Sequence, residues 1–448
     1  MNRIDVTRIP WARALLMARG PQLTVQLLAL AGFLLIIAAG LFGTAAGSRN
    51  LATVGVWIAW WAALMLFAVP FFGRLWCGVC PLPLPGEWLQ RGALLRPRPG
   101  GLGLGLRWPR RLRGMWVQNA AFLGVALFSV PILTDPRLTA ALLVGLVLLA
   151  IVLSMVFERR AFCRYVCPIG GFVGLYSQAA PVEVRVRDPL VCAGHTTKTC
   201  YTGNERGYGC PWLVFPGSLS TNLSCGVCLE CLRTCPLDNV AVNLRPPGAD
   251  LARSATPRTD ELFKSLLLLG SALIYALVLL GPSTALRRAA LDVGSAAWFG
   301  YAAAFLLIAV VVIPGSFFLA TAIGRPEHRR WTDLTWARSF TSALVPLGIA
   351  AWVAFSLAFV LANLAYLAPA LADPLSLGWN LLGGNAIPWT PIPLGVWPLV
   401  VVLSGGLAWT IYRSVRVVQR HNGGLLAAAP VGAFCLALVS GMLWVFAG

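Results

Sequence analysis

Residues 138–168 read LTAALLVGLVLLAIVLSMVFERRAFCRYVCP, an uncharged apolar run that ends in a basic segment with two cysteines. An α-helix rises about 1.5 Å per residue, so the run at 138–157 can cross the roughly 30 Å hydrocarbon core of a bilayer. Its apolar residues are continuous rather than alternating, which favours a membrane helix over a strand of a membrane barrel.

Apolar runs of this kind recur along the whole chain. Of its 448 residues 58% are hydrophobic and 11% charged, and the mean hydropathy is +0.76. Soluble proteins are about half apolar and about a quarter charged, so a soluble, disordered or disulfide-scaffold protein is excluded. The sequence predicts an α-helical integral membrane protein with about nine transmembrane helices, at 22–46, 51–72, 115–134, 138–157, 265–283, 296–323, 340–367, 395–413 and 424–447.

The positive charge indicates how the chain is oriented. Lys and Arg number 35 against 16 Asp and Glu, and they gather in the loops 73–114, 324–339 and 412–423, whereas 368–394 has none. Aromatic residues are not interleaved with these clusters, so we expect a lipid bilayer and no nucleic acid as partner. Basic loops stay in the cytoplasm, which places the N-terminus and the loop 158–264 inside and the C-terminus outside.

The same pattern divides the chain into four parts. We expect a basic N-terminus at 1–20, amphipathic or flexible, and two repeated transmembrane hairpins at 21–157, each ending in a Cys-Pro motif. A cytoplasmic ferredoxin-like domain follows at 158–264, and a five-helix membrane domain at 265–448.

The strongest chemical motif is SCGVCLECLRTCP at 224–236, a C-x2-C-x2-C-x3-C-P pattern. In bacterial ferredoxins three thiolates of this pattern bind one cubane and the fourth binds its neighbour. The alternative is a zinc site, which needs four thiolates in a tetrahedral array and is more typical of two separated C-x2-C pairs. Disulfides are rare on the reducing side of the membrane, so the cysteines are candidate metal ligands.

Three upstream cysteines extend this motif to two clusters. Cys210 is followed by Pro211, as is typical of a cysteine that crosses to a neighbouring cluster. One predicted cluster is bound by Cys225, Cys228, Cys231 and Cys210, and the second by Cys235, Cys192 and Cys200. The second set is one thiolate short, so His195 or a borrowed cysteine completes it, or the second cluster is absent.

A repeated motif closes each hairpin. Residues 74–81 read RLWCGVCP and residues 160–168 read RAFCRYVCP. Packing of the hairpins about a pseudo-two-fold axis would gather four thiols, those of Cys77, Cys80, Cys163 and Cys167. They suffice for one [4Fe-4S] cluster; a redox-active dithiol and structural packing are the alternatives.

Arginines flank these motifs, and one cysteine lies apart from them. The neighbouring Arg74, Arg159, Arg160 and Arg164 either favour thiolate or extend to lipid phosphates. Cys435 lies inside an apolar run, where we expect a small packing residue.

Together these motifs resemble the NapH/NosR/CcoG group of bacterial membrane polyferredoxins, over residues 20–245. The resemblance implies two or three [4Fe-4S] clusters in a bacterial inner-membrane protein, the electron-transfer component of an oxidoreductase system. Such proteins pass electrons between the quinone pool or soluble donors and partner redox proteins, with quinone a further candidate cofactor. An accessory role in maturation of a respiratory enzyme and redox sensing are the alternatives. The sequence departs from the family at Cys77 and Cys80, which are one residue closer than Cys163 and Cys167.

Overall fold

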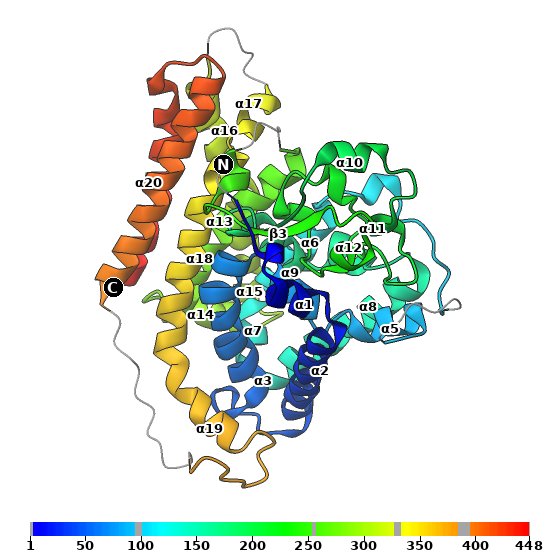
Figure 1. The fold of residues 1–448 in the computed structure, drawn as a ribbon. Helices are drawn as coiled ribbons and strands as arrows, with labels where there is room; N and C mark the ends of the chain where they lie inside the picture. The colour runs from blue at the N-terminus through cyan, green and yellow to red at the C-terminus, as the bar shows by residue number, and fades with distance from the viewer. Residues whose placement is uncertain (1–2, 95–100, 253–256, 327–332, 384–394, 448) are drawn as a thin grey trace. The chain divides into compact units, whose positions relative to one another are not determined.

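The computed structural model describes residues 3–94, 101–252, 257–326, 333–383 and 395–447. The fold is mostly helical, with 71% of residues in helices (Figure 1). The basic loops 73–114 and 324–339 and the loop 368–394, which has no Lys or Arg, each lie in part outside the described residues.

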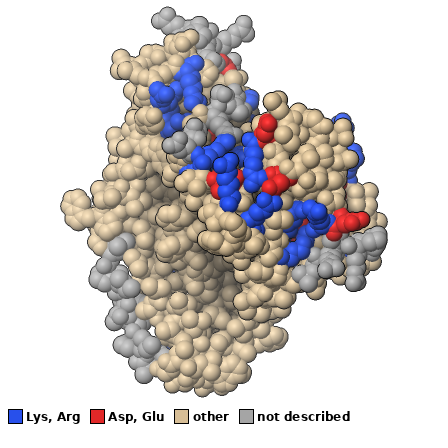
Figure 2. All heavy atoms as spheres, in the orientation of Figure 1, with Lys and Arg blue, Asp and Glu red and all other residues tan. Residues whose placement is uncertain are grey.

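Within these residues, eight helices are long and apolar enough to cross a membrane. They are α2 (Arg19–Phe42), Leu51–Phe72 (α3, η3 and η4), α8 (Pro136–Val156), α13 (Thr259–Leu279), Ala296–Ile323 (α15, η10 and α16), Thr341–Ala372 (α18, η11 and α19), α20 (Val396–Arg420) and Leu425–Ala447 (η13 and α21). Several expose large apolar side chains, among them Leu28 of α2 and Val152 of α8. Figure 2 shows wide stretches of the visible face without charged side chains, as a lipid-facing surface requires. The chain is therefore a multi-pass membrane protein by the length and composition of its helices.

The range 115–134 differs from the single long helix that the sequence predicts. The structure has a short helix α6 (Trp116–Leu127) and a second helix α7 (Ser129–Thr134). Phe128 separates them with φ −95° and ψ 16°, outside helical geometry. Neither helix alone is long enough to span a bilayer.

The chain forms two compact units. One contains Ala38–Leu66, Asn119–Thr139 and Leu251–Gly448. In this unit α18 (Thr341–Asn363) packs against α13 and α20. Buried Trp352 donates from Nε1 to the Leu268 carbonyl at 2.9 Å, and Trp61 donates to Ser356 Oγ at 3.0 Å.

The other unit contains Met1–Ile37, Phe67–Gln118 and Ala140–Asp250, and it holds eleven of the twelve cysteines. Its small antiparallel sheet has the order β1-β3-β2 (Ile4–Asp5, Val240–Leu244 and Val182–Val186). Val182 pairs with Leu244 and Val186 with Val240.

The N-terminal residues are folded into this unit. Besides β1 they form the helix α1 (Pro10–Met17), whose Leu16 and Met17 pack against the apolar core around β2 and β3. Arg233 donates to the carbonyls of Leu16, Met17 and Ala18. Of the two expected alternatives, an amphipathic or a flexible segment, the structure favours an ordered amphipathic one, because the sheet and Arg233 satisfy backbone groups that a loose segment would leave to water.

Candidate iron-sulfur site

The two Cys-Pro motifs end in the same backbone conformation despite their different spacing. The first forms an α-turn, α4 (Leu75–Val79), and the second a π-turn, η6 (Phe162–Val166). A π-turn bonds i to i+5, so it holds one residue more than an α-turn. The residue that follows each turn has nearly the same backbone conformation: Cys80 has φ −57° and ψ 129°, and Cys167 has φ −57° and ψ 118°. The extra residue between Cys163 and Cys167 is thus absorbed in the turn.

The four thiols of these motifs lie close enough to influence one another. Burial raises the pKa of Cys80, and the neighbouring thiols of Cys77 and Cys167 raise it further. Burial likewise raises the pKa of Cys163, and Cys167, Cys80 and Cys77 add to it. The pKa of Cys167 rises to about 11, chiefly through burial. The structure therefore brings together the four thiols that the repeat predicts, which we call the hairpin thiols.

Polar side chains fix the backbone around the hairpin thiols. Arg160 donates from Nη1 to the Cys77 carbonyl at 2.7 Å, and Gln26 donates to the Gly78 carbonyl at 3.0 Å. The Gly170 N–H donates to Cys167 Sγ at 3.3 Å. N–H groups aimed at a cluster-ligating sulfur are one means by which a protein tunes reduction potential.

Cys210, Cys225, Cys228 and Cys231 line one small cavity, and we call them the cavity thiols. The loop that carries three of them wraps the cavity through left-handed residues, Val227 at φ 47° and Leu229 at φ 65°. A β-branched residue in this region is strained, and such strain persists only where the surroundings enforce it.

Trp212 also lines this cavity and is buried, and its indole Nε1–H has no hydrogen-bond partner among the residues that the structure describes. An orphaned buried donor costs free energy unless a bound group accepts from it. A cubane offers sulfide and thiolate acceptors, so four thiols and an unpartnered donor around one cavity fit a [4Fe-4S] cluster.

Cys192, Cys200 and Cys235 form the third group. Burial raises the pKa of Cys200 to about 11, and the thiols of Cys235 and Cys192 contribute. Asn239 joins the other two, because its side-chain amide donates to Cys192 Sγ at 3.2 Å and its backbone N–H to Cys235 Sγ at 3.3 Å. His195 Nε2 instead lies 2.8 Å from Thr197 Oγ1. The structure gives this group three thiols and no histidine contact with them.

The three groups are neighbours. A Cβ on Gly78, between Cys77 and Cys80, would lie 3.4 Å from the Gly226 carbonyl and 3.6 Å from Cys228 Cα, so the hairpin and cavity loops touch. Cys200 and Cys231 belong to one apolar core, and Cys200 contributes to the raised pKa of Cys231. The cavity thiols therefore adjoin both of the other groups.

Four arginines beside the motifs hold loop backbone. Arg159 donates to the Cys210 carbonyl at 2.5 Å, and Arg164 donates to the carbonyls of Trp212 and Leu213. Arg74 donates to the Leu223 carbonyl, and Arg74 and Arg160 are each only 4% exposed. Extension of Arg74 and Arg160 to lipid phosphates is therefore wrong, because the protein buries both guanidinium groups.

Twelve cysteines lie within the described residues, and none of them forms a disulfide there. In the same residues no three His, Cys, Asp or Glu side chains are placed to hold a single metal ion. The ligands of a cubane stand further apart than those of one ion, because each thiolate binds a different iron. Cys435 is buried in α21 (Ala429–Ala447), as expected for a packing residue.

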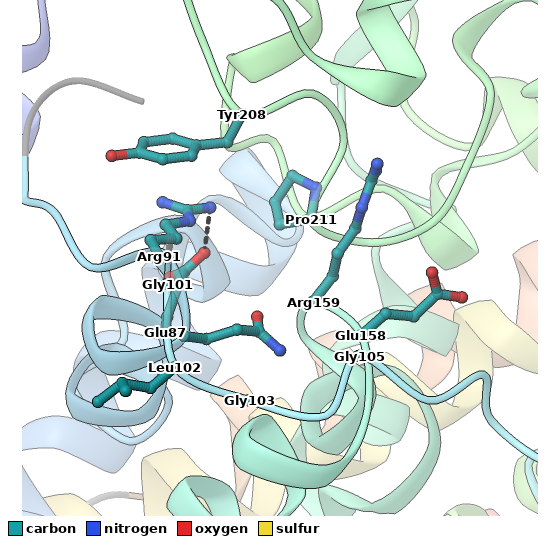
Figure 3. A pocket seen from close by; sticks show the side chains of 11 residues that line it. Glu87, Arg91, Gly101, Leu102, Gly103, Gly105, Glu158, Arg159, Tyr208 and Pro211 are labelled. Atoms are coloured by element: carbon teal, nitrogen blue, oxygen red, sulfur yellow. Dashed lines mark ion pairs between the residues drawn. The ribbon is translucent and has the colours of Figure 1, made fainter. Parts of the chain in front are cut away.

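The structure also has an open pocket of about 340 Å³ (Figure 3). One of its lining residues is Pro211, which directly follows the cavity thiol Cys210 in the sequence. The Arg91 guanidinium carbon lies 4.1 Å from the centre of the Tyr208 ring, and Arg91 forms an ion pair with Glu87. The sequence did not predict Glu87, Trp212 or Asn239 as site residues, because contacts with segments far away in the sequence bring them to the site. Only Asn239 could have been suspected from the sequence, because it lies four residues after Cys235.

Comparison with known proteins finds one family of iron-sulfur proteins and one weak relative. Residues 53–114 and 139–185 match the model of a 4Fe-4S binding domain, which covers both Cys-Pro motifs. A putative electron transport protein of Escherichia coli strain K12, YccM, is 27% identical over 103 residues. That match covers 22% of this chain and 26% of the relative, so the two share about a quarter of their lengths. No solved structure gives a significant match.

Proposed function

We propose that this protein carries electrons across the face of a bacterial inner membrane through a row of [4Fe-4S] clusters. Bound clusters would supply one-electron redox chemistry, and the chain supplies ligands, burial and hydrogen bonds that set their potentials. The hairpin thiols would hold one cluster and the cavity thiols a second. The observation that carries the proposal is that two sets of four thiols, six of them buried and Cys80 and Cys225 partly buried, lie on loops that touch.

The third group would hold a further cluster if a fourth ligand is supplied. Its three thiols are Cys192, Cys200 and Cys235, with Asn239 donating to two of the sulfurs. Because the cavity thiols adjoin both this group and the hairpin thiols, electrons would enter at one of these two groups and leave at the other. The name of the E. coli relative supports electron transport.

The orientation of the chain in the membrane suggests which redox partners it meets. The Arg-rich loops favour a cytoplasmic unit for the eleven clustered cysteines, a ferredoxin-like insertion that a soluble redox protein can reach. The hairpin thiols follow directly on apolar helices, so a membrane protein or a quinone would exchange electrons with that end.

Iron and sulfide counting with reduced-state EPR tests the proposal. Protein purified without oxygen should contain about eight to twelve iron atoms and matching sulfide per chain, at four per cluster. Dithionite should produce the spectra of interacting one-electron centres. A colourless protein, or one with zinc and no iron, would refute the proposal.

A turnover assay then separates electron transfer from the alternatives. Reduced protein in liposomes should be reoxidised by a short-chain quinone or by a soluble acceptor over many cycles. Reduction without turnover would instead favour a sensor or an accessory factor.

A further inference from the structure

The two Cys-Pro motifs share an arginine three residues before their first cysteine. Arg74 precedes Cys77, and Arg160 precedes Cys163. Both side chains are buried to the same extent, at 4% exposure. The repeat therefore places two positive charges at equivalent positions beside the hairpin thiols.

Only one of the two charges is neutralised by the protein. Arg160 donates from Nε to Glu87 Oε2 at 2.9 Å, and the two form a buried ion pair. Arg160 also donates a hydrogen bond from Nη1 to the Cys77 carbonyl. Glu87 also pairs with Arg91, whose side chain is partly exposed to solvent. The two deeply buried charges, those of Arg160 and Glu87, cancel, so they add little to the potential felt by the thiols.

Arg74 forms no ion pair with any acidic side chain that the structure describes. Its Nη1 donates to the Leu223 carbonyl, while Nε and Nη2 are buried without a hydrogen-bond partner. The guanidinium carbon lies 4.3 Å from the centre of the Trp212 ring. A buried charge without a counter-charge is strongly unfavourable, so a further negative group is expected near Arg74.

The thiols that could supply this negative charge come from two groups. The Arg74 guanidinium lies against Trp212, which lines the same cavity as Cys225. A Cβ on Gly174 would lie 2.9 Å from Arg74 Nη1, and Gly174 belongs to the helix Pro168–Tyr176 that starts directly after Cys167. Cys167 is a hairpin thiol and Cys225 a cavity thiol. Arg74 therefore lies close to both predicted clusters.

We propose that Arg74 is the positioning residue whose unneutralised charge compensates the clusters on either side of it and raises their reduction potentials. The inference rests on the proposed function, since it needs clusters at both sets of thiols. Reduction adds one electron and so one negative charge, and a buried positive charge nearby stabilises the reduced form. Arg160, which is paired with Glu87, has this effect only if its partner is removed.

Potentiometric EPR titration of the full-length protein in detergent, with dithionite and mediators, tests this inference. Arg74→Gln should lower the equilibrium constant for reduction of at least one cluster tenfold or more, a fall of about 59 mV for a one-electron couple. Arg74→Lys keeps the charge and should stay within threefold of wild type. Arg8→Gln removes the same formal charge from a side chain that is 81% exposed, and it should leave the potential unchanged.

A second variant should shift the potential in the opposite direction. Glu87→Gln leaves Arg160 unneutralised, and Arg160 lies close enough for Cys163 and Cys228 to affect its own pKa. The reduction potential should therefore rise. This opposite sign separates an effect of charge from general loosening of the loops, which would shift both variants the same way.

Three results would overturn the inference. They are an iron-replete Arg74→Gln protein with the potential of Arg8→Gln, an Arg74→Lys protein shifted as far as Arg74→Gln, and a fall in potential on Glu87→Gln. If Arg74→Gln loses its iron, the sign for Glu87→Gln decides. Absence of iron from the wild-type protein would instead refute the proposed function, so the two failures are distinguishable.

Discussion

At the scale of single residues, the cysteines are buried more deeply than reactive thiols usually are. The pKa values of Cys167 and Cys200 rise to about 11, with burial as the main cause for both. Without a metal these side chains stay protonated at neutral pH, since burial disfavours the thiolate. Cluster binding must therefore release protons, and iron bound to the thiolates replaces them.

Alkylation of the iron-free protein should show these raised pKa values. At pH 8 a thiol of pKa 11 is about 0.1% thiolate, against about a quarter for an unperturbed cysteine. Carbamidomethylation of Cys167 and Cys200 should therefore speed up tenfold per pH unit to about pH 11. Peptide mass spectrometry at a series of pH values measures the rates, with the SDS-denatured protein as control. A plateau near pH 9 in the folded protein would contradict the prediction.

Gly226 is a residue at which a single methyl group should disrupt the cavity. A Cβ there would lie 1.9 Å from Trp212 Nε1, so either the indole or the loop must move. Gly226→Ala should cost about 1–3 kcal/mol or more and release iron at a lower temperature. The decay of charge-transfer absorbance on heating measures this effect. Gly194→Ala is the matched control, because nothing lies within 4 Å of its Cβ, and equal loss in both variants would argue against the clash.

At the scale of elements, the sequence predicted what is local and missed what is long-range. Thiol spacing and continuous apolar runs are local, so the three cysteine sets and the long helices could be proposed from them. The π-turn of η6 could not be predicted from the sequence. An α-turn and a π-turn differ by a single residue, and tertiary contacts determine which of the two forms. The strand β1 and the pair of Arg160 with Glu87 also join segments far apart in sequence, for which no short pattern exists.

The hairpin thiols make an element-scale prediction about additivity. If Cys77 and Cys163 bind one cluster, Cys77→Ser and Cys163→Ser should each remove about four irons. The double variant should then lose no more than either single variant, because both changes remove the same unit. Iron counting on the three proteins measures this, with Cys435→Ser as a control that keeps all iron. An eight-iron loss in the double variant would show two separate clusters.

At the scale of the whole molecule, the number of crossings decides where the C-terminus lies. Eight crossings would return it to the side of the N-terminus, and nine would place it on the other side. The difference depends on α6 and α7, which are each short but together cover residues 116–134, about 28 Å at 1.5 Å per residue. That length nearly equals the hydrocarbon core, so we expect the two helices to cross it together despite the break at Phe128.

Reporter fusions to the full-length chain test this expectation. With nine crossings, alkaline phosphatase at the C-terminus should be active, since it folds outside the cytoplasm, and green fluorescent protein there should be dark. Green fluorescent protein at the N-terminus should fluoresce in the same cells, because the Arg-rich loops keep that end inside. Fluorescence from both ends would mean that α6 and α7 do not cross. Residues 158–264 and the C-terminal helices would then be inverted relative to the prediction, and the cysteines at 192–235 would lie outside the cytoplasm.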